Sequence, residues 1–219
     1  MAINLTKGQK IDLRKESGAS LTNFCVGVNW GAIETKGLFG LSKSKKSVDL
    51  DLSCILIDDN NKFCDHIYSP LYNIDFLQKF GLPKGKLNSV DNALRHTGDD
   101  LQGDTGGDDG LDNEIITVDL NMIDNKVTKI YFFLNNVGAE DFAQIPYAKI
   151  RMYEGTPTHV KEVFASYNVS AEPGYSGKKA LIMGKLYKRN NEWKFDAIGD
   201  PTADKFLGET IQLIINSYL

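Results

Sequence analysis

The chain has 219 residues and a formal net charge of −4, with 42% hydrophobic and 25% charged residues. This length is enough for one large β domain or two small ones with a substantial buried core. The negative balance, with no aromatic residues interleaved among basic ones, gives no reason to expect nucleic acid as a partner.

The cysteines and the apolar runs exclude several further classes of protein. Cys25, Cys54 and Cys64 are odd in number and show no CxxC spacing, which argues against a disulfide framework and a zinc site. We expect all three to be buried reduced thiols. No apolar run approaches the roughly 18 residues of a membrane span, and the first residues lack the features of a signal peptide. We therefore expect a soluble cytoplasmic protein.

Alternation of apolar and polar residues at a period of two dominates the chain and predicts β-strands. In chain order the predicted strands are 9–13, 24–30, 47–56, 62–68, 115–120, 128–136, 147–154, 159–167, 178–188 and 192–199. Many strands with few helices predict an all-β fold, a β-sandwich of two mainly antiparallel sheets. Because neither an internal repeat nor a linker is visible, residues 1–219 are expected to form a single domain.

A C-terminal α-helix is the one long helix that the sequence predicts. Thr202 fits its N-cap and Asp204 its first turn. Apolar residues then recur at helical spacing on one face, at Leu207, Ile211, Ile214 and Tyr218. A shorter helical turn is predicted over 74–80, before the breaker sequence GLPKG.

The most informative segment is GDDLQGDTGGDDGLDNE, residues 98–114, which holds seven carboxylates and five glycines and no lysine or arginine. Without these seven charges the rest of the chain would carry +3, so the acidity is concentrated in one place. Like charges about 4 Å apart repel by roughly 4 kcal/mol at an effective dielectric of about 20. A folded loop of this kind therefore needs a cation, and oxygen ligands on a flexible backbone suit calcium. The alternative is a disordered acidic loop, although strand-like sequence lies on both sides of it.

A second acidic pattern lies in the predicted strand 47–56. Asp49 and Asp51 alternate with apolar residues, so they project from one face about 6.6 Å apart and could flank or share an ion. The alternative is a solvated polar face. Together with the loop the chain offers nine carboxylates, enough for about two calcium ions. Neither an EF-hand nor an RTX register fits, so the site must be assembled in another way.

These motifs resemble the TerD family of tellurite-resistance and chemical-stress proteins, and TerZ-like members in particular. The resemblance rests on HTGDDLQGDTGGDDGLDNEIITVDL, VDLDLSCILID and INLTKGQKIDL, and it extends to the late GKLYKRNNEWKFDAIGD. It implies a calcium-binding β-sandwich, typically with two calcium ions held by the acidic loop and neighbouring strand residues. The ligands carried over by motif are Asp49, Asp51, Asp99, Asp100, Asp104, Asp108, Asp109, Asp112 and Glu114. The family often has GWD where this chain has Asn29-Trp30-Gly31, so one ion would bind more weakly, or through Asn29 or a backbone oxygen.

Three functions compete on this evidence. The preferred one is a non-enzymatic calcium-binding module of a tellurite or chemical-stress response, acting with other stress-response proteins in a signalling or membrane-associated assembly. The second is a two-metal phosphoester hydrolase, for which the chain offers no compelling base. The third is a calcium-dependent lectin-like sandwich, which the missing signal peptide disfavours. Trp30, Trp193, Phe132 and Phe195 could form an aromatic platform for carbohydrate, although all four fit core strands better. No P-loop, GxGxxG or GxSxG motif is present.

Two weaker signals have ordinary explanations. The basic run at 43–46 could meet an acidic surface, but a solvated hairpin tip explains it better. His96 lies at the rim of the acidic loop, where we expect it to hydrogen-bond or pack rather than to act as a ligand or base.

Overall fold

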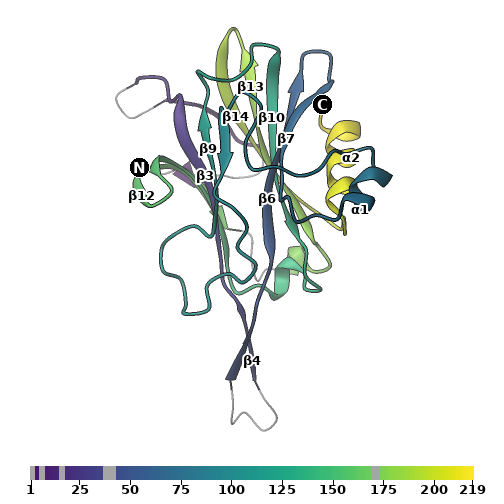
Figure 1. Cartoon of the computed structure of the whole chain (residues 1–219). Coiled ribbons are helices and arrows are strands. Elements are labelled where there is room, and N and C mark those ends of the chain that lie inside the picture. Colours follow the sequence, from purple (N-terminus) through teal and green to yellow (C-terminus); the bar gives the residue numbers. More distant parts are fainter. Residues whose placement is uncertain (1–2, 5–7, 15–17, 37–42, 169–172) are drawn as a thin grey trace.

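The chain folds into two six-stranded β-sheets that face each other, as the alternation predicted (Figure 1). This computed structural model describes residues 3–4, 8–14, 18–36, 43–168 and 173–219. The order of the first sheet is β1 (Ile3–Asn4), β12 (His159–Asn168), β11 (Ala148–Thr156), β3 (Asn23–Trp30), β9 (Glu114–Asp119), β8 (Leu94–His96). That of the second is β2 (Lys10–Asp12), β14 (Glu192–Thr202), β13 (Ala180–Arg189), β10 (Val127–Asn136), β6 (Leu50–Asp58), β7 (Phe63–Ile67). Neighbouring strands are antiparallel except β1 and β12, which run parallel.

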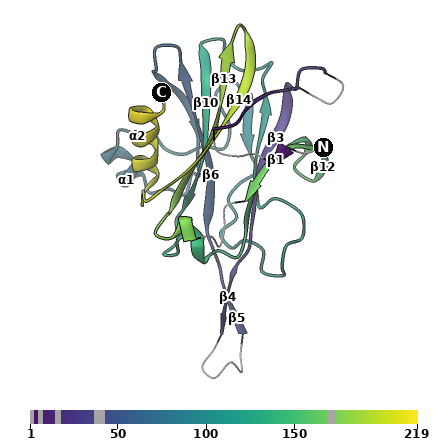
Figure 2. The ribbon, with the colours of Figure 1, turned by 180° about the vertical axis from the view of Figure 1, so that it is seen from behind.

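The basic run belongs to a two-stranded hairpin that projects from one end of the sandwich (Figure 2). Residues 43–46 form its second strand, β5 (Lys43–Lys46), which pairs with β4 (Ile33–Lys36). The hairpin prediction is therefore correct, but the basic residues lie along a strand and not at the tip, which falls outside the described residues.

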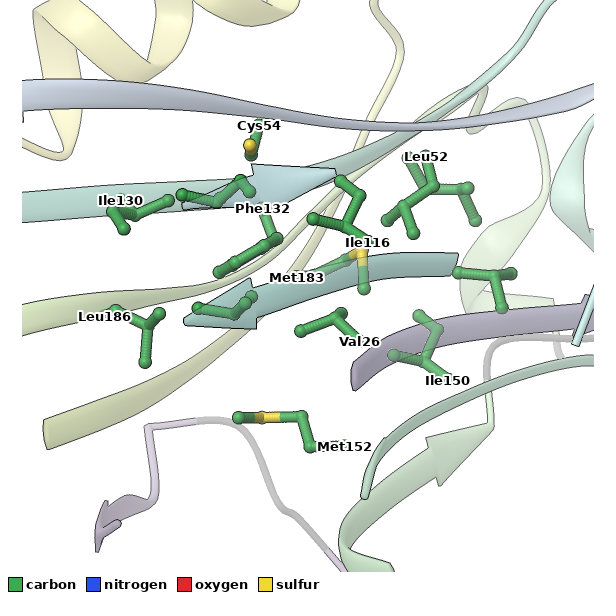
Figure 3. Close-up of a cluster of buried hydrophobic side chains, with 14 of the residues drawn as sticks. Val26, Leu52, Cys54, Ile116, Ile130, Phe132, Ile150, Met152, Met183 and Leu186 are labelled. Atoms are coloured by element: carbon green, nitrogen blue, oxygen red, sulfur yellow. The ribbon is translucent and has the colours of Figure 1, made fainter. Parts of the chain in front are cut away.

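The main core lies between the two sheets (Figure 3). Leu52 and Cys54 of β6 and Phe132 of β10 face Val26 and Ile150 of the first sheet, all at most 2% exposed. Alternation at a period of two therefore places one face of each strand in this layer. Of the three free cysteines, Cys25 and Cys54 are buried as predicted, whereas Cys64 is only half-buried.

A second apolar layer covers the outer face of the second sheet, where the sequence pattern indicated solvent. Ile55 and Ile57 of β6 and Phe133 of β10 pack there beneath α1 (Ile74–Lys79) and α2 (Leu207–Ser217). Asp51 lies on this same face and is only 4% exposed. A solvated position for Asp51 was therefore wrong, because helices and connecting segments that are distant in sequence cover that face.

Both predicted helices form, with one displaced boundary. Asn73 caps α1 by accepting the Asp75 amide at 2.8 Å, close to the predicted start. Helix α2 begins at Leu207, five residues after the predicted cap, because Thr202 still pairs with Ala180 at the end of β14. Short 3₁₀ helices occupy Phe142–Gln144 and Pro173–Tyr175.

The packing of α2 gives the first testable prediction. Ile211 is fully buried against the second sheet, whereas Ile215 on the same helix is 36% exposed. Ile211→Ala should lower the free energy of unfolding by about 2–5 kcal/mol through lost burial and a cavity, as measured by urea denaturation. Ile215→Ala removes the same atoms from the same helix and should cost less than about 1 kcal/mol. Equal effects of the two changes would contradict the described packing.

Candidate metal centre

The acidic loop joins β8 to β9 and is fastened to the end of the sandwich from which the hairpin projects. The Asp104 amide donates to Trp30 O at 2.9 Å, and the Val48 amide donates to Gln102 O at 3.1 Å. Gly103 adopts a φ of +68°, and a Cβ there would lie 2.5 Å from the Trp30 ring. Only glycine fits this approach, so the loop is tied to the backbone at the ends of two strands.

Three carboxylates from different elements converge beneath this loop. Asp51 comes from β6 in the second sheet, Glu114 opens β9 in the first sheet, and Asp99 lies in the loop. One ligand oxygen of each lies within 4.8 Å of the other two. The charges of Glu114, Asp99 and Asp100 all act on Asp49, and we call these four residues together with Asp51 the inner acidic cluster.

Glu114 is held in place by hydrogen bonds from both sides. It is completely buried, and its Oε2 accepts the Leu52 amide at 2.7 Å. That amide is free because β7 pairs with β6 only as far as Cys54. Glu114 Oε1 accepts the Asp100 amide at 3.1 Å. One carboxylate thus links the second sheet to the acidic loop.

His96 takes the positioning role that the sequence suggested. Its Nδ1 accepts the Gly98 amide at 3.0 Å, which leaves the hydrogen on Nε2. Nε2 lies 3.3 Å from Glu114 Oε2. The imidazole therefore lies beside Glu114, but its Nε2 is buried without a hydrogen-bond partner among the described residues.

Burial raises the pKa values of three members of the cluster, Asp49, Asp51 and Glu114. Burial raises the pKa of Asp49 to about 6, and the charge of Glu114 adds to that shift. Burial also raises the pKa of Asp51 well above its usual range, again with a contribution from Glu114 and against a smaller opposing one from Tyr72. The pKa of Glu114 is raised by burial, although His96 opposes the change. Within the described parts of the chain, no lysine or arginine forms an ion pair with any of the five.

The rim of the cluster is a network of hydrogen bonds to side chains that the sequence did not single out. Ser69 Oγ donates to Asp99 Oδ2 at 2.6 Å. Asn113 Nδ2 donates to Asp100 Oδ2 at 2.9 Å and to Asp104 Oδ1 at 3.2 Å, and Tyr147 donates to Asp104 Oδ2 at 2.8 Å. Asp104 is thereby placed between the inner cluster and the rest of the loop.

The remaining loop acids lie apart from the inner cluster, and two of them are paired with basic residues. We call Asp108, Asp109 and Asp112 the outer acidic group. Lys149 of β11 forms an ion pair with Asp108. Arg151 Nε, from the same strand, donates to both oxygens of Asp112 at 2.8 and 3.0 Å. Although the loop contains no basic residue, β11 supplies two cations to it.

Asn29 helps to hold this outer part of the loop. Its Nδ2 donates to Asp108 Oδ1 at 3.3 Å and also to Leu111 O, while its Oδ1 is buried without a hydrogen-bond partner. Lys149 and Arg151 lie two residues apart in a strand that the sequence predicted. No signal in the sequence indicated that this strand borders the acidic loop.

The inner cluster has the chemistry of a divalent-cation site. Its donors are carboxylate oxygens, and Asp49 Oδ1 is buried with no hydrogen-bond partner among the described residues. An ion there would satisfy that oxygen and offset the repulsion that raises the pKa values. The residues present therefore fit a metal ion, which the chain would hold through Asp51, Asp99 and Glu114. No described helix is long and apolar enough to cross a membrane.

Comparison with known proteins agrees with this architecture. The sequence profile of the TerD domain matches residues 1–212. The chain is 33% identical over 218 residues to stress response protein SCP2 of Bacillus subtilis (strain 168), covering 96% of this chain and 98% of the relative. It is 30% identical over 222 residues to tellurium resistance protein TerD of Serratia marcescens, with 99% and 100% coverage. For TerZ of the same organism the identity is 30% over 198 residues, with 90% and 89% coverage.

Solved structures support the fold. The crystal structure of a TerD homologue from Streptomyces coelicolor A3(2) superposes with a TM-score of 0.59 at 10% identity, covering 90% of this chain and 96% of that one. The chain therefore belongs to the TerD-domain family, whose relatives include tellurium resistance and stress response proteins.

Proposed function

We propose that this protein is a calcium-binding, non-enzymatic module of a tellurite or chemical-stress response, acting in the cytoplasm through contacts with other proteins of that response. The observation that carries the proposal is the inner acidic cluster, a group of buried and half-buried carboxylates from both sheets and the loop with no lysine or arginine paired to it among the described residues. The names of the relatives support the stress-response setting.

Electrostatics favours a divalent ion over an ion-free cluster at neutral pH. Unit charges about 4 Å apart interact by roughly 4 kcal/mol at an effective dielectric of about 20. Protonation or a cation must relieve this repulsion. Because burial raises the pKa of Asp49 only to about 6, this carboxylate is charged at neutral pH, where a cation would relieve its repulsion from the others.

The donor set favours calcium over transition metals. Calcium takes six to eight oxygen ligands in a flexible geometry, which bidentate carboxylates, backbone carbonyls and water can supply. Zinc prefers cysteine and histidine ligands. No cysteine is part of the cluster, and the neighbouring His96 uses Nδ1 to accept the Gly98 amide, so the donors of the cluster are carboxylate oxygens.

A second ion has weaker support. We assign it to the region of Asp104, next to Asp100, with Asp109 as a further exposed carboxylate. Asp108 and Asp112 are already neutralised by Lys149 and Arg151, so they contribute less charge to a second site. Of the nine predicted ligands, the strongest candidates are therefore Asp49, Asp51, Asp99, Asp100 and Glu114.

An ion at the inner cluster would act as a clamp. Asp51 belongs to the second sheet, Glu114 to the first, and Asp99 to the loop, so shared coordination would fix all three elements relative to one another. Ser69 is bonded to Asp99, and its Oγ also accepts the Leu71 amide at 3.0 Å on the way to α1. Ion binding would therefore order a surface that partner proteins can contact.

Removal of one inner carboxylate tests the assignment. Asp51→Asn keeps the shape of the side chain and removes its charge, so calcium affinity should fall at least about 10-fold, or about 1.4 kcal/mol. Isothermal titration calorimetry of protein freed of metal by EDTA measures the effect. Asp109→Asn removes the same charge from the exposed outer group and should leave the first binding event unchanged.

Three results would count against the proposal. Equal losses in the two variants would move the site away from the inner cluster. No calcium binding by the unmodified chain would remove the proposed function itself. Hydrolysis of a generic phosphodiester with manganese, abolished by Asp49→Ala, would favour the two-metal hydrolase instead.

The raised pKa values predict an unusual dependence of stability on pH in the absence of metal. Asp49 has a pKa of about 6 in the folded chain and about 3.9 when unfolded, so the folded state binds more protons between these values. Stability of the EDTA-treated protein should therefore fall as pH rises from 5 to 7.5, and calcium should restore more stability at pH 7.5 than at pH 5.

The Asp49→Asn variant is the control for this measurement. His66, whose pKa is lowered by burial, contributes a slope of opposite sign, but it contributes equally to both proteins. The melting temperature of the unmodified chain should therefore drop more between pH 5 and 7.5 than that of the variant, both with EDTA present. Parallel curves of melting temperature against pH would show that the pKa of Asp49 is not raised in the folded chain.

A further inference from the structure

A small cavity lies beside the inner acidic cluster, on the outer layer of the second sheet. It has a volume of about 190 Å³ and is enclosed by α1, the start of α2 and the end of β10. Phe76, Phe80, Phe206, Leu207 and Val137 supply most of its apolar wall. Helix α2 comes so close to Phe80 here that a Cβ on Gly208 would lie 2.2 Å from the Phe80 ring.

The volume of the cavity limits its occupant to one aromatic side chain. A cavity of about 150 Å³ lined by apolar residues is enough to bind benzene. A space of about 190 Å³ therefore accommodates a phenol or an indole, whereas a nucleotide or an oligosaccharide would not fit.

One polar group in the wall selects among aromatic rings. Asn135 lines the cavity and is only 3% exposed. Its Nδ2 donates to Thr210 Oγ1 at 2.9 Å, but its Oδ1 is buried without a hydrogen-bond partner. Leaving a buried acceptor unpaired is unfavourable, and a ligand carrying an N–H or O–H can recover that cost. Tryptophan and tyrosine have such a donor, and phenylalanine does not.

The mouth of the cavity favours a protein segment over a free small molecule. Phe76, Phe206 and Val137 are 48%, 47% and 50% exposed, and the rings of Phe76 and Phe206 stack at 5.7 Å. This apolar rim extends beyond what a single ring would cover. Lys79 Nζ lies 4.6 Å from the Phe76 ring centre, and Lys205 is the one charged residue among the described residues that line the cavity, so two basic side chains border its mouth.

We propose that this cavity is a docking site for a partner protein, which inserts one tryptophan or tyrosine side chain flanked by acidic residues. The ring fills the cavity, its N–H or O–H donates to Asn135 Oδ1, and the flanking carboxylates meet Lys79 and Lys205. Such a buried aromatic anchor with a polar rim is typical of interaction hot spots.

The docking site shares a wall with the inner acidic cluster. Asn135 is the cross-strand partner of Asp51, and Tyr72 contributes both to the cavity and to the surroundings of Asp51. The Val137 amide donates to Asp49 O at 3.0 Å. The inference rests on the proposed function only for the kind of partner, a protein of the same stress response. Binding of the aromatic ring itself would need no metal ion.

Indole and indene test the cavity, because they have the same shape and differ in the N–H donor. We expect indole to produce saturable NMR shifts at Asn135, Val137 and Gly208 and to bind at least 3-fold more tightly than indene. The double variant Phe76→Ala/Phe206→Ala should weaken indole binding at least 5-fold. Leu71→Ala/Val90→Ala removes apolar side chains that are 67% and 81% exposed but do not line the cavity, and it should have no effect.

Peptides then identify the source of the ring. A five-residue peptide with a central tryptophan between Asp-Glu pairs should bind more tightly than indole, and more weakly as salt increases, whereas its leucine counterpart should not bind. Absence of indole shifts, or equal binding of indole and indene, would overturn the site. Indole binding without peptide binding would overturn the protein partner in favour of a free small ring. Calcium titration reads out separately, so its failure would affect the metal assignment alone.

Discussion

Crowding of buried carboxylates where the two sheets meet is the constraint on which the rest of this structure depends. Asp51 and Glu114 come from opposite sheets, and Asp99 joins them from the loop. Burial raises the pKa values of Asp51 and Glu114, and the charge of Glu114 adds to the shift at Asp51. Hydrogen bonds from Leu52, Asp100 and Ser69 orient these groups but bring no positive charge. A cation bound among these oxygens would relieve the repulsion.

The third layer of the fold explains why that crowding is severe. A two-layer sandwich would leave the outer face of β6 in water, where adjacent carboxylates repel weakly. Helices α1 and α2 cover this face, and the segment that leads into α1 covers Asp51 at its end. The same covering creates the aromatic cavity next to Asn135. The candidate metal centre and the docking site are thus two consequences of one buried outer face.

Local patterns in the sequence predicted most of the fold and identified the residues that make up the acidic loop. Alternation indicated the strands, and helical spacing indicated α2. What it could not predict depends on contacts between distant segments. The burial of Asp51 requires Tyr72, just before α1, and the acidic loop to lie against its strand, and the pairing of Asp112 with Arg151 requires β11 to lie beside β3. For the same reason the end of β14, set by pairing with β13, displaced the start of α2.

The two parts of the acidic loop obtain their charge balance in different ways, and this determines what an ion can change. Lys149 and Arg151 neutralise the outer acidic group from within the chain, so that half of the loop remains attached to β11 with or without metal. The inner cluster has no such partner among the described residues. An ion at the inner cluster would therefore act on the inner half of the loop. Its effect would pass through Asp99 and Ser69 toward Tyr72 and α1. Because Tyr72 also lines the cavity, the route from ion to docking site is a few side chains long and needs no rearrangement of either sheet.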